Sequence, residues 1–328
     1  MRRREFIGLV GVAVLPLRAS AQQAERMRLI GVLTPYPDKN NPEAQARIKA
    51  FLQELQQLGW TADGNLQVEY RWTSGDQDSI RKAATELAAL PLDAILGTST
   101  PAVTALQQAT RTLPIVFVMV ADPVASGFVA SLAKPGGNIT GFPIFEYGVS
   151  TKWLEQLKEI VPGVTRVGVI RDPTIGSNVG QFAAIHSVAP SFGVELTPLG
   201  GRDAREVEQT ITEFARGSNC GMICAASPLV VNNGDLIISL AARYRIPTVY
   251  PLRYFVAQGG LTSYGPDSIN FYRQAAGYID RILRGEKPAD LPVQGATKYE
   301  LAINLRTAKA IGLSIAPAVI ARADEVIE

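Results

Sequence analysis

The sequence has a single histidine, and few of its 328 residues are charged. With His186 alone, a zinc site of several histidines or a Ser-His-Asp triad has little to build on, so we expect His186 to be structural, within a helix. Charged residues make up 19% of the chain, the net charge is +2, and no run of like charges follows the N-terminus. The glycine-rich nucleotide loops Gly-x-Gly-x-x-Gly and Gly-x-x-x-x-Gly-Lys-Ser/Thr are absent. We therefore expect no metal, no cofactor, no nucleic acid partner and no enzymatic turnover.

Cysteine is equally scarce, with Cys220 and Cys224 the only two. Both lie in an apolar run that we expect to be a strand, where residues four apart point the same way but are about 13 Å apart. A disulfide requires Cα atoms within about 7 Å, so this pair cannot form one. We expect two thiols that pack as small hydrophobic side chains.

The N-terminus has the three-part pattern of a signal peptide. Residues 2–4 are all arginine, residues 6–17 are apolar, and residues 19–21 are Ala-Ser-Ala. The apolar run is shorter than the ~20 residues that span a bilayer as a helix. The pattern predicts a signal peptide over residues 1–21, cleaved near Ala21, and a periplasmic mature protein. The paired arginines also resemble a twin-arginine export signal.

Apolar periodicity predicts strands that alternate with helices along the rest of the chain, of which 47% of residues are hydrophobic. In the first series we expect strands at 29–33, 66–72, 93–97, 114–120 and 138–142, and helices at 43–58, 78–90, 101–111 and 123–133. In the second we expect strands at 166–170, 194–199, 221–225, 248–250 and 260–264, and helices at 150–161, 177–192, 204–216 and 229–244. An amphipathic helix at 269–283 then suits a return to the first lobe.

Two such series predict an α/β fold of two Rossmann-like, doubly wound lobes joined by a hinge. We expect residues 27–143 with about 266–290 in lobe 1, and residues 144–265 in lobe 2, because Gly265 and Pro266 form a natural crossing segment. The pattern does not decide where residues 291–328 pack.

Ligands of open α/β sheets bind beyond the carboxyl ends of the strands, and those positions are rich in hydroxyls and prolines in the first lobe. The candidates there are Thr34, Pro35, Ser99, Thr100, Asp122 and Pro123. Helix-capping residues followed by free backbone N–H groups suit a ligand carboxylate. The alternative is that these residues only cap their helices.

In the second lobe the corresponding candidates are Asp172, Ser227 and Tyr250, with Tyr264 and Asp267 at the crossing. Asp172 would accept a ligand ammonium group, and the tyrosines would stack on a ring or hydrogen-bond to it. The alternative for Asp172 is an Asp-Pro turn. The set predicts an amino-acid-like ligand.

Short segments through the chain carry a resemblance to a known family. They are residues 69–72, 115–117, 121–124, 134–141, 264–267, 272–273, 299–304, 307–312 and 321–324. In this order and spacing they resemble the ABC transporter substrate-binding protein family, of type I periplasmic binding protein fold, over nearly the whole mature chain. At Asp172 the family more often has asparagine.

The resemblance implies a monomeric hinge protein that delivers a small molecule to a membrane permease and ATPase. Some members of the family are associated with aromatic amino acids, and Ser99, Thr100, Asp122 and Tyr264 are the positions to which a binding role is carried over. Capture by lobe closure is the expected mechanism. A ligand-sensing module for a receptor would use the same fold. An exported α/β enzyme would need Asp122 or Asp172 as an acid or base.

Overall fold

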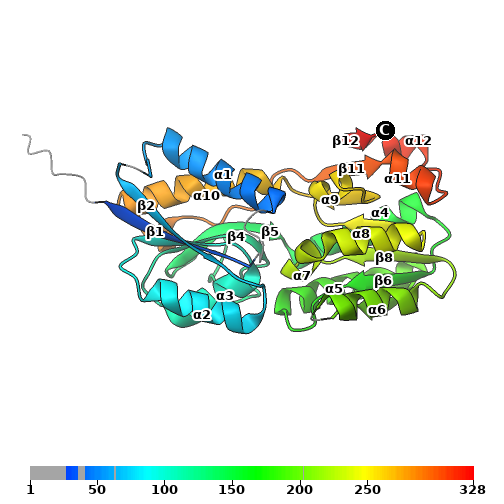
Figure 1. Cartoon of the computed structure of the whole chain (residues 1–328), viewed down its shortest axis with the longest axis horizontal. Coiled ribbons are helices and arrows are strands. Elements are labelled where there is room, and N and C mark those ends of the chain that lie inside the picture. Colours follow the sequence, from blue (N-terminus) through cyan, green and yellow to red (C-terminus); the bar gives the residue numbers. More distant parts are fainter. Residues whose placement is uncertain (1–26, 36–40, 63, 202) are drawn as a thin grey trace, which may run out of the picture.

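The computed structural model describes residues 27–35, 41–62, 64–201 and 203–328 (Figure 1). The chain forms two α/β lobes that lie end to end, each with helices on both faces of a sheet (Figure 1). The predicted two-lobed α/β fold is therefore confirmed. The predicted signal peptide lies outside the described residues.

The first lobe is built on a five-stranded parallel sheet of order β2-β1-β3-β4-β5. Its strands are β1 (Arg28–Thr34), β2 (Leu66–Trp72), β3 (Ala94–Gly97), β4 (Ile115–Ala121) and β5 (Ile139–Phe145). Helices α1 (Pro42–Gln57) and α10 (Ser268–Leu283) pack together on one face, and α2 (Gln77–Ala88) and α3 (Thr100–Ala109) cover the other (Figure 1). The inner strands β3 and β4 are apolar along their whole length because both faces of the sheet are covered.

The second lobe has a seven-stranded sheet of order β12-β11-β10-β9-β8-β6-β7. Its strands are β6 (Arg166–Ile170), β7 (Glu195–Leu199), β8 (Cys220–Cys224), β9 (Thr248–Tyr250), β10 (Thr262–Gly265), β11 (Glu300–Asn304) and β12 (Glu325–Ile327). Its helices are α4 (Thr151–Ile160), α5 (Gly176–Val188), α6 (Ala204–Phe214), α7 (Pro228–Asn232), α8 (Gly234–Arg243), α9 (Arg253–Ala257), α11 (Leu305–Ala310) and α12 (Pro317–Ile320). The C-terminal segment adds β11, antiparallel to β10, and β12 to this sheet.

Two predicted helices differ in the structure. Residues 123–133 form turns instead of a helix, because the Asp122 carboxylate accepts the Ala125 N–H (3.0 Å) and the Pro123 carbonyl accepts the Phe128 N–H (2.9 Å). The predicted helix at 229–244 is broken into α7 and α8 at Asn233, whose side-chain amide donates to the Leu229 carbonyl (2.8 Å). Side chains that bond to nearby backbone compete with helical hydrogen bonds in this way.

The chain passes between the lobes at residues 146–150, 265–267 and 295–299. At the second passage Gly265 lies so close to the Pro251 carbonyl that a Cβ atom would be 1.9 Å from its oxygen, so only glycine fits. Short 3₁₀ turns, η1 (Tyr147–Ser150), η2 (Ala189–Phe192) and η3 (Pro288–Asp290), complete the secondary structure described.

An aromatic group, which we call the hinge aromatic cluster, joins these passages. It consists of Phe145, Trp153, Tyr264 and Tyr299. Trp153 lies edge-on to Phe145 (5.2 Å between centroids) and Tyr264 stacks on Tyr299 (5.7 Å). The Trp153 indole N–H donates to the Tyr264 carbonyl (2.8 Å), and burial raises the pKa of Tyr299. The cluster thus connects all three passages in one packed unit.

Replacing Trp153 with phenylalanine tests this unit. Trp153 is fully buried, so Trp153→Phe leaves the Tyr264 carbonyl without its donor and opens a small cavity. We expect the free energy of unfolding to fall by about 1–3 kcal/mol. Urea unfolding followed by circular dichroism measures it. Trp72→Phe, at a half-buried position on the edge strand β2, is the control and should cost less. Equal losses in the two variants would contradict a special role for the cluster.

Candidate functional site

A cavity of about 40 Å³ lies between the lobes, where the carboxyl ends of the strands face one another. We call it the cleft cavity. Its lining comes from both lobes and is Thr98, Ser99, Thr100, Pro101, Met119, Ala121, Ile144, Ile175, Ser177, Ala226, Ser227, Pro228, Val231, Pro251 and Leu252.

The first lobe contributes the N-terminus of α3. Ser99 caps this helix by accepting the Ala102 N–H (3.2 Å), and Pro101 occupies its first turn, where a missing N–H costs nothing. The Thr100 hydroxyl accepts the Ala121 N–H (3.3 Å), so it connects the start of α3 to the end of β4. Because Pro101 has no N–H and the Ala102 N–H is bonded to Ser99, the Thr100 N–H is the first-turn donor of α3 left beside the cavity.

The end of β4 has an irregular backbone that places a side chain in the cavity lining. The pairing of β4 with β5 shifts register on both sides of Val120, and Met119 has a φ of 60°. Positive φ is uncommon for residues other than glycine, and bulges of this kind redirect side chains next to functional sites. Met119 lines the cleft cavity as a result.

The second lobe contributes the N-terminus of α5 and the cap of α7. Ser227 caps α7 by accepting the Val230 N–H (3.4 Å). Ser177, in the first turn of α5, is 4% exposed and lines the cavity, and within the described part of the chain no residue hydrogen-bonds its hydroxyl. A buried hydroxyl without a partner is costly, so this group is available to a ligand.

Asn178 holds these two segments of the second lobe together. It is fully buried, its side-chain oxygen accepts the Asp172 N–H (2.9 Å), and its amide donates to the Ala226 carbonyl (2.9 Å). The loops after β6 and β8 are therefore bound to the same side chain. Asn178 acts as a positioning residue for the second-lobe half of the cavity.

Every residue that lines the cleft cavity is neutral. The electrostatic feature of the site is that two helices, α3 with 10 residues and α5 with 13, begin there from opposite lobes. Helix N-termini carry partial positive charge and free N–H donors, so they favour an anion. Met119, Ile144, Val231 and Leu252 supply apolar wall beside them. The arrangement suits a carboxylate attached to an apolar body.

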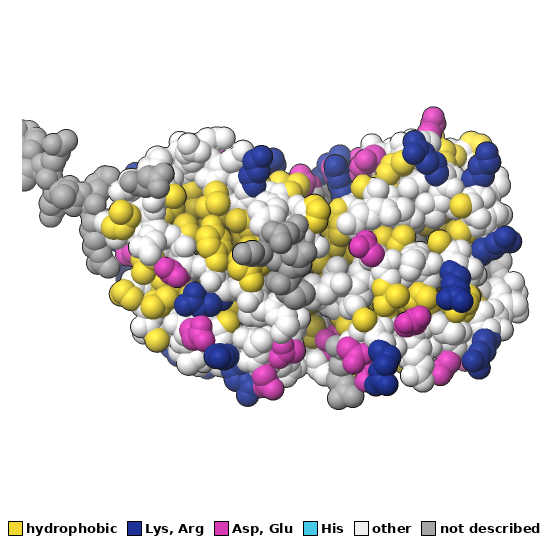
Figure 2. All heavy atoms as spheres, viewed as in Figure 1, with side chains coloured by type: hydrophobic (Ala, Val, Ile, Leu, Met, Phe, Trp, Pro, Cys, Tyr) yellow, Lys and Arg dark blue, Asp and Glu magenta, His cyan; other side chains and the backbone are white. Residues whose placement is uncertain are grey.

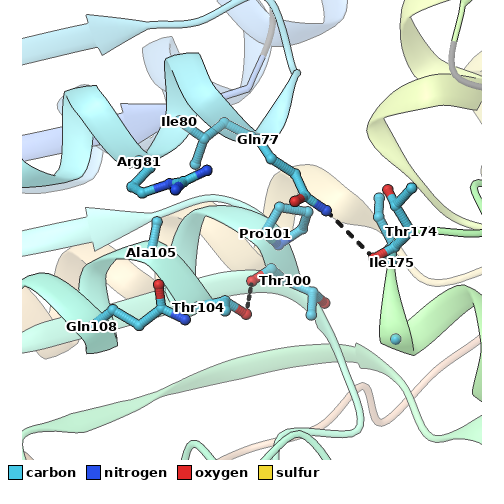
Figure 3. A pocket seen from close by; sticks show the side chains of 11 residues that line it. Gln77, Ile80, Arg81, Thr100, Pro101, Thr104, Ala105, Gln108, Thr174 and Ile175 are labelled. Carbon is cyan, nitrogen blue, oxygen red and sulfur yellow. Dashed lines mark hydrogen bonds between the residues drawn. The ribbon is translucent and has the colours of Figure 1, made fainter.

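A second, larger cavity of about 400 Å³ adjoins the first between α2, α3 and the loop before α5 (Figure 3). We call it the α2–α3 cavity. Its lining is Gln77, Ile80, Arg81, Thr100, Pro101, Thr104, Ala105, Gln108, Thr174, Ile175 and Gly176. Thr100, Pro101 and Ile175 line both cavities, so the two are neighbours across these residues.

Between the described residues, two hydrogen bonds join the lobes across the opening. The Gln77 amide donates to the Thr174 carbonyl (3.5 Å; Figure 3), and the Asn232 amide donates to the Pro35 carbonyl (3.4 Å). Both distances are at the long end for hydrogen bonds, so each contributes little free energy. The lobes are in contact, but weakly so at this edge.

Three of the predicted ligand-binding residues, Ser99, Thr100 and Ser227, line the cleft cavity. The structure places the others elsewhere. Asp172 accepts the N–H (2.8 Å) and hydroxyl (2.7 Å) of Thr174 in a turn, as in the alternative interpretation. Asp122 and Pro123 hold the turn that follows β4.

The remaining predicted residues lie in the core or at the hinge. Tyr250 is 1% exposed and stacks on Phe255 (5.2 Å), inside the second lobe. Tyr264 belongs to the hinge aromatic cluster, and Asp267 caps α10 by accepting the Ile269 N–H (2.9 Å). Thr34 is buried at the end of β1, and the Pro35 carbonyl accepts the Asn232 side-chain amide N–H (3.4 Å).

The lining residues that sequence reasoning missed are mostly apolar or lie inside a helix. Met119 and Leu252 carry no chemical signal in the sequence. The stripe of Thr100, Thr104 and Gln108, spaced four apart, was detectable, because such residues share one face of a helix.

The other sequence predictions concern cysteine, histidine and surface charge. Cys220 and Cys224 are free thiols, as predicted, and burial raises the pKa of both. His186 is exposed on α5, with its ring 6.1 Å from that of Phe182.

In the described ranges no three His, Cys, Asp or Glu side chains gather as a metal site, and no helix is long and apolar enough to span a bilayer. Basic and acidic side chains are interspersed on the face that Figure 2 shows.

Comparison with known proteins identifies the family. A family model described as "ABC transporter substrate binding protein" matches residues 40–327. The "Tyrosine-binding protein" of Clostridioides difficile (strain R20291) is 27% identical over 273 residues, which are 83% of this chain and 78% of that protein.

Two solved structures have a similar fold. An ABC domain from Streptococcus pneumonia in complex with L-Trp superposes with a TM-score of 0.84 at 24% identity, over 92% of this chain and 99% of that one. A ligand-free, open substrate binding protein from Clostridium difficile superposes with a TM-score of 0.64, at the same identity and coverages. Since the family model spans nearly all of the described residues, this chain belongs to the ABC transporter substrate binding protein family.

Proposed function

We propose that this protein captures an amino-acid-like ligand, with an aromatic side chain as the first candidate, in the cleft between its lobes. The observation that carries the proposal is the convergence of the α3 and α5 N-termini, from opposite lobes, on one neutral cavity. A ligand carboxylate bound there would contact both lobes at once. The relatives described as a tyrosine-binding protein and as an L-Trp complex support an aromatic amino acid.

Capture proceeds by closure of the lobes. A ligand shifts a hinge equilibrium only by its differential affinity for the closed state, and a group held between α3 and α5 has partners on both sides only when the lobes meet. The better superposition on the L-Trp complex than on the open, ligand-free protein supports a closed arrangement here. Since the hydrogen bonds across the opening are long, the ligand supplies most of the closing free energy.

The closed protein then delivers its ligand to a permease and its ATPase at the membrane. We propose that the chain reaches the periplasm through the signal peptide over residues 1–21, by the twin-arginine route or the general one, and acts as a monomer. The described lining of the cleft cavity offers no acid or base. This supports binding without turnover.

Carboxylate recognition predicts a sharp difference between matched ligands. L-tyrosine and L-tryptophan should raise the melting temperature of the protein, because a ligand that binds only the folded state stabilises it by mass action. Tyramine and tryptamine keep the ring and the amine but lack the carboxylate, and they should not. A thermal-shift assay compares the four. Stabilisation by the amines alone would contradict the proposal.

Ser177→Val tests the second-lobe half of the site. The substitution replaces the hydroxyl with two methyl groups beside a cavity of about 40 Å³. We expect at least a roughly ten-fold loss of affinity for the best amino acid, comparable to losing a hydrogen bond to a charged group. Calorimetry measures it, with Ser187→Val, at an exposed position of the same helix, as the control. Unchanged affinity in Ser177→Val would remove α5 from the site.

The neutral lining also predicts little pH dependence. None of the residues that line the cleft cavity titrates between about pH 5.5 and about pH 8, and a ligand α-carboxylate stays ionised throughout that range. The affinity should therefore vary by less than about three-fold across it. Calorimetric titrations at several pH values measure this. A steep change near neutrality would indicate a titrating group in the site and contradict the assignment.

A further inference from the structure

The cleft cavity is too small for a whole amino acid. Its volume of about 40 Å³ is only a few times the ~10–15 Å³ that a cavity needs to hold one water molecule. It therefore accommodates a group of carboxylate size and little more. The α2–α3 cavity has about 400 Å³ and shares three lining residues with it. Among the described cavities, the α2–α3 cavity is the neighbouring space with room for the body of a ligand whose carboxylate lies at the α3 and α5 N-termini.

The α2–α3 cavity runs along one face of α3. Thr100, Thr104 and Gln108 line it at four-residue intervals, and eight residues of helix correspond to about 12 Å. Thr100 is at the end that adjoins the cleft cavity, and Gln108 is at the far end. Ile80 and Ala105 supply apolar surface between the two ends. The cavity is thus an elongated space with a seat for an anion at one end.

The far end carries hydrogen-bond donors. Arg81 from α2 and Gln108 from α3 lie there on facing helices, away from Thr174 of the second lobe (Figure 3). Arg81 pairs with Asp78 (2.6 Å), but both side chains are largely exposed, and a guanidinium group has five N–H donors. The pair leaves Arg81 with donors for another acceptor.

Residues of both lobes line the end of the α2–α3 cavity that adjoins the cleft cavity. Gln77, at the start of α2, donates to the Thr174 carbonyl, and Thr174 and Ile175 line the cavity from the second lobe. A ligand that fills the α2–α3 cavity therefore touches both lobes along its body as well as at its carboxylate. Occupation of this space would add to the preference for the closed state.

We infer that the α2–α3 cavity is the subsite for the ligand's side chain, and that Arg81 and Gln108 select a side chain ending in a hydrogen-bond acceptor. The inference rests on the proposed function, because the carboxylate seat sets where the side chain begins. The ligand class is an amino acid whose apolar or aromatic body ends in a hydroxyl, carbonyl or carboxylate oxygen. Arg81 would then be a specificity-determining residue.

The test compares three ligands that differ only at the far end of the ring: L-phenylalanine, L-tyrosine and 4-carboxy-L-phenylalanine. Wild-type protein should bind the last two at least about ten-fold more tightly than phenylalanine, the difference that one charge-assisted hydrogen bond makes. In Arg81→Met this preference should fall to about three-fold or less while the affinity for phenylalanine is retained. Isothermal titration calorimetry measures all three.

Lys82→Met is the matched control. Lys82 is the neighbouring cation on the same helix, it is exposed like Arg81, and it does not line the cavity. Lys82→Met should leave the preference for L-tyrosine and 4-carboxy-L-phenylalanine over L-phenylalanine unchanged. A wild-type protein that binds the three ligands equally, an Arg81→Met that weakens all three equally, or a Lys82→Met that acts like Arg81→Met would overturn the subsite. If wild type bound no amino acid at all, the proposed function itself would fail, and the subsite with it.

Discussion

The packing of the three chain passages at the hinge is the constraint on which the rest of the molecule depends. Phe145, Tyr264 and Tyr299 come from different passages and pack with Trp153, whose indole N–H donates to the backbone of the second passage. Because all three passages meet in one cluster, the lobes are held with the carboxyl ends of their strands facing each other. Helix N-termini that would otherwise point into solvent therefore point into a shared cleft.

The site uses the same local device in both lobes. A parallel strand ends and a serine that caps the next helix lines the cleft cavity, as at Ser99 and Ser227. The N-termini of α3 and α5 supply positive potential there without a cationic side chain. An ion pair buried in the cleft would have to be desolvated at each closure, whereas backbone N–H groups are already in place. A neutral lining thus suits a cleft that opens and closes.

Sequence periodicity predicted strands and helices correctly where burial and local hydrogen bonding favour the same secondary structure. The inner strands β3 and β4 are apolar throughout, and α1 ends at Gln57, within one residue of the predicted end at 58, with Gly59 at a φ of 95° just beyond it. It failed at residues 123–133, where the Asp122 side chain and Pro123 carbonyl take up the backbone N–H groups that a helix would have used. It also merged α7 and α8, whose break at Asn233 depends on a single side-chain contact to the Leu229 carbonyl.

The amino-acid pattern was enough to predict the two-lobed α/β fold, the family resemblance and those cleft residues whose role is local. Ser99, Thr100 and Ser227 could be predicted because a helix cap depends only on its nearest neighbours in the chain. Only the tertiary structure decided that Tyr250 is in the core, that Asp172 forms a turn, and that Met119, Ser177 and Arg81 line the cavities. The reason is physical: a cleft is made by segments far apart in the sequence, and whether a side chain faces it depends on how one lobe packs against the other.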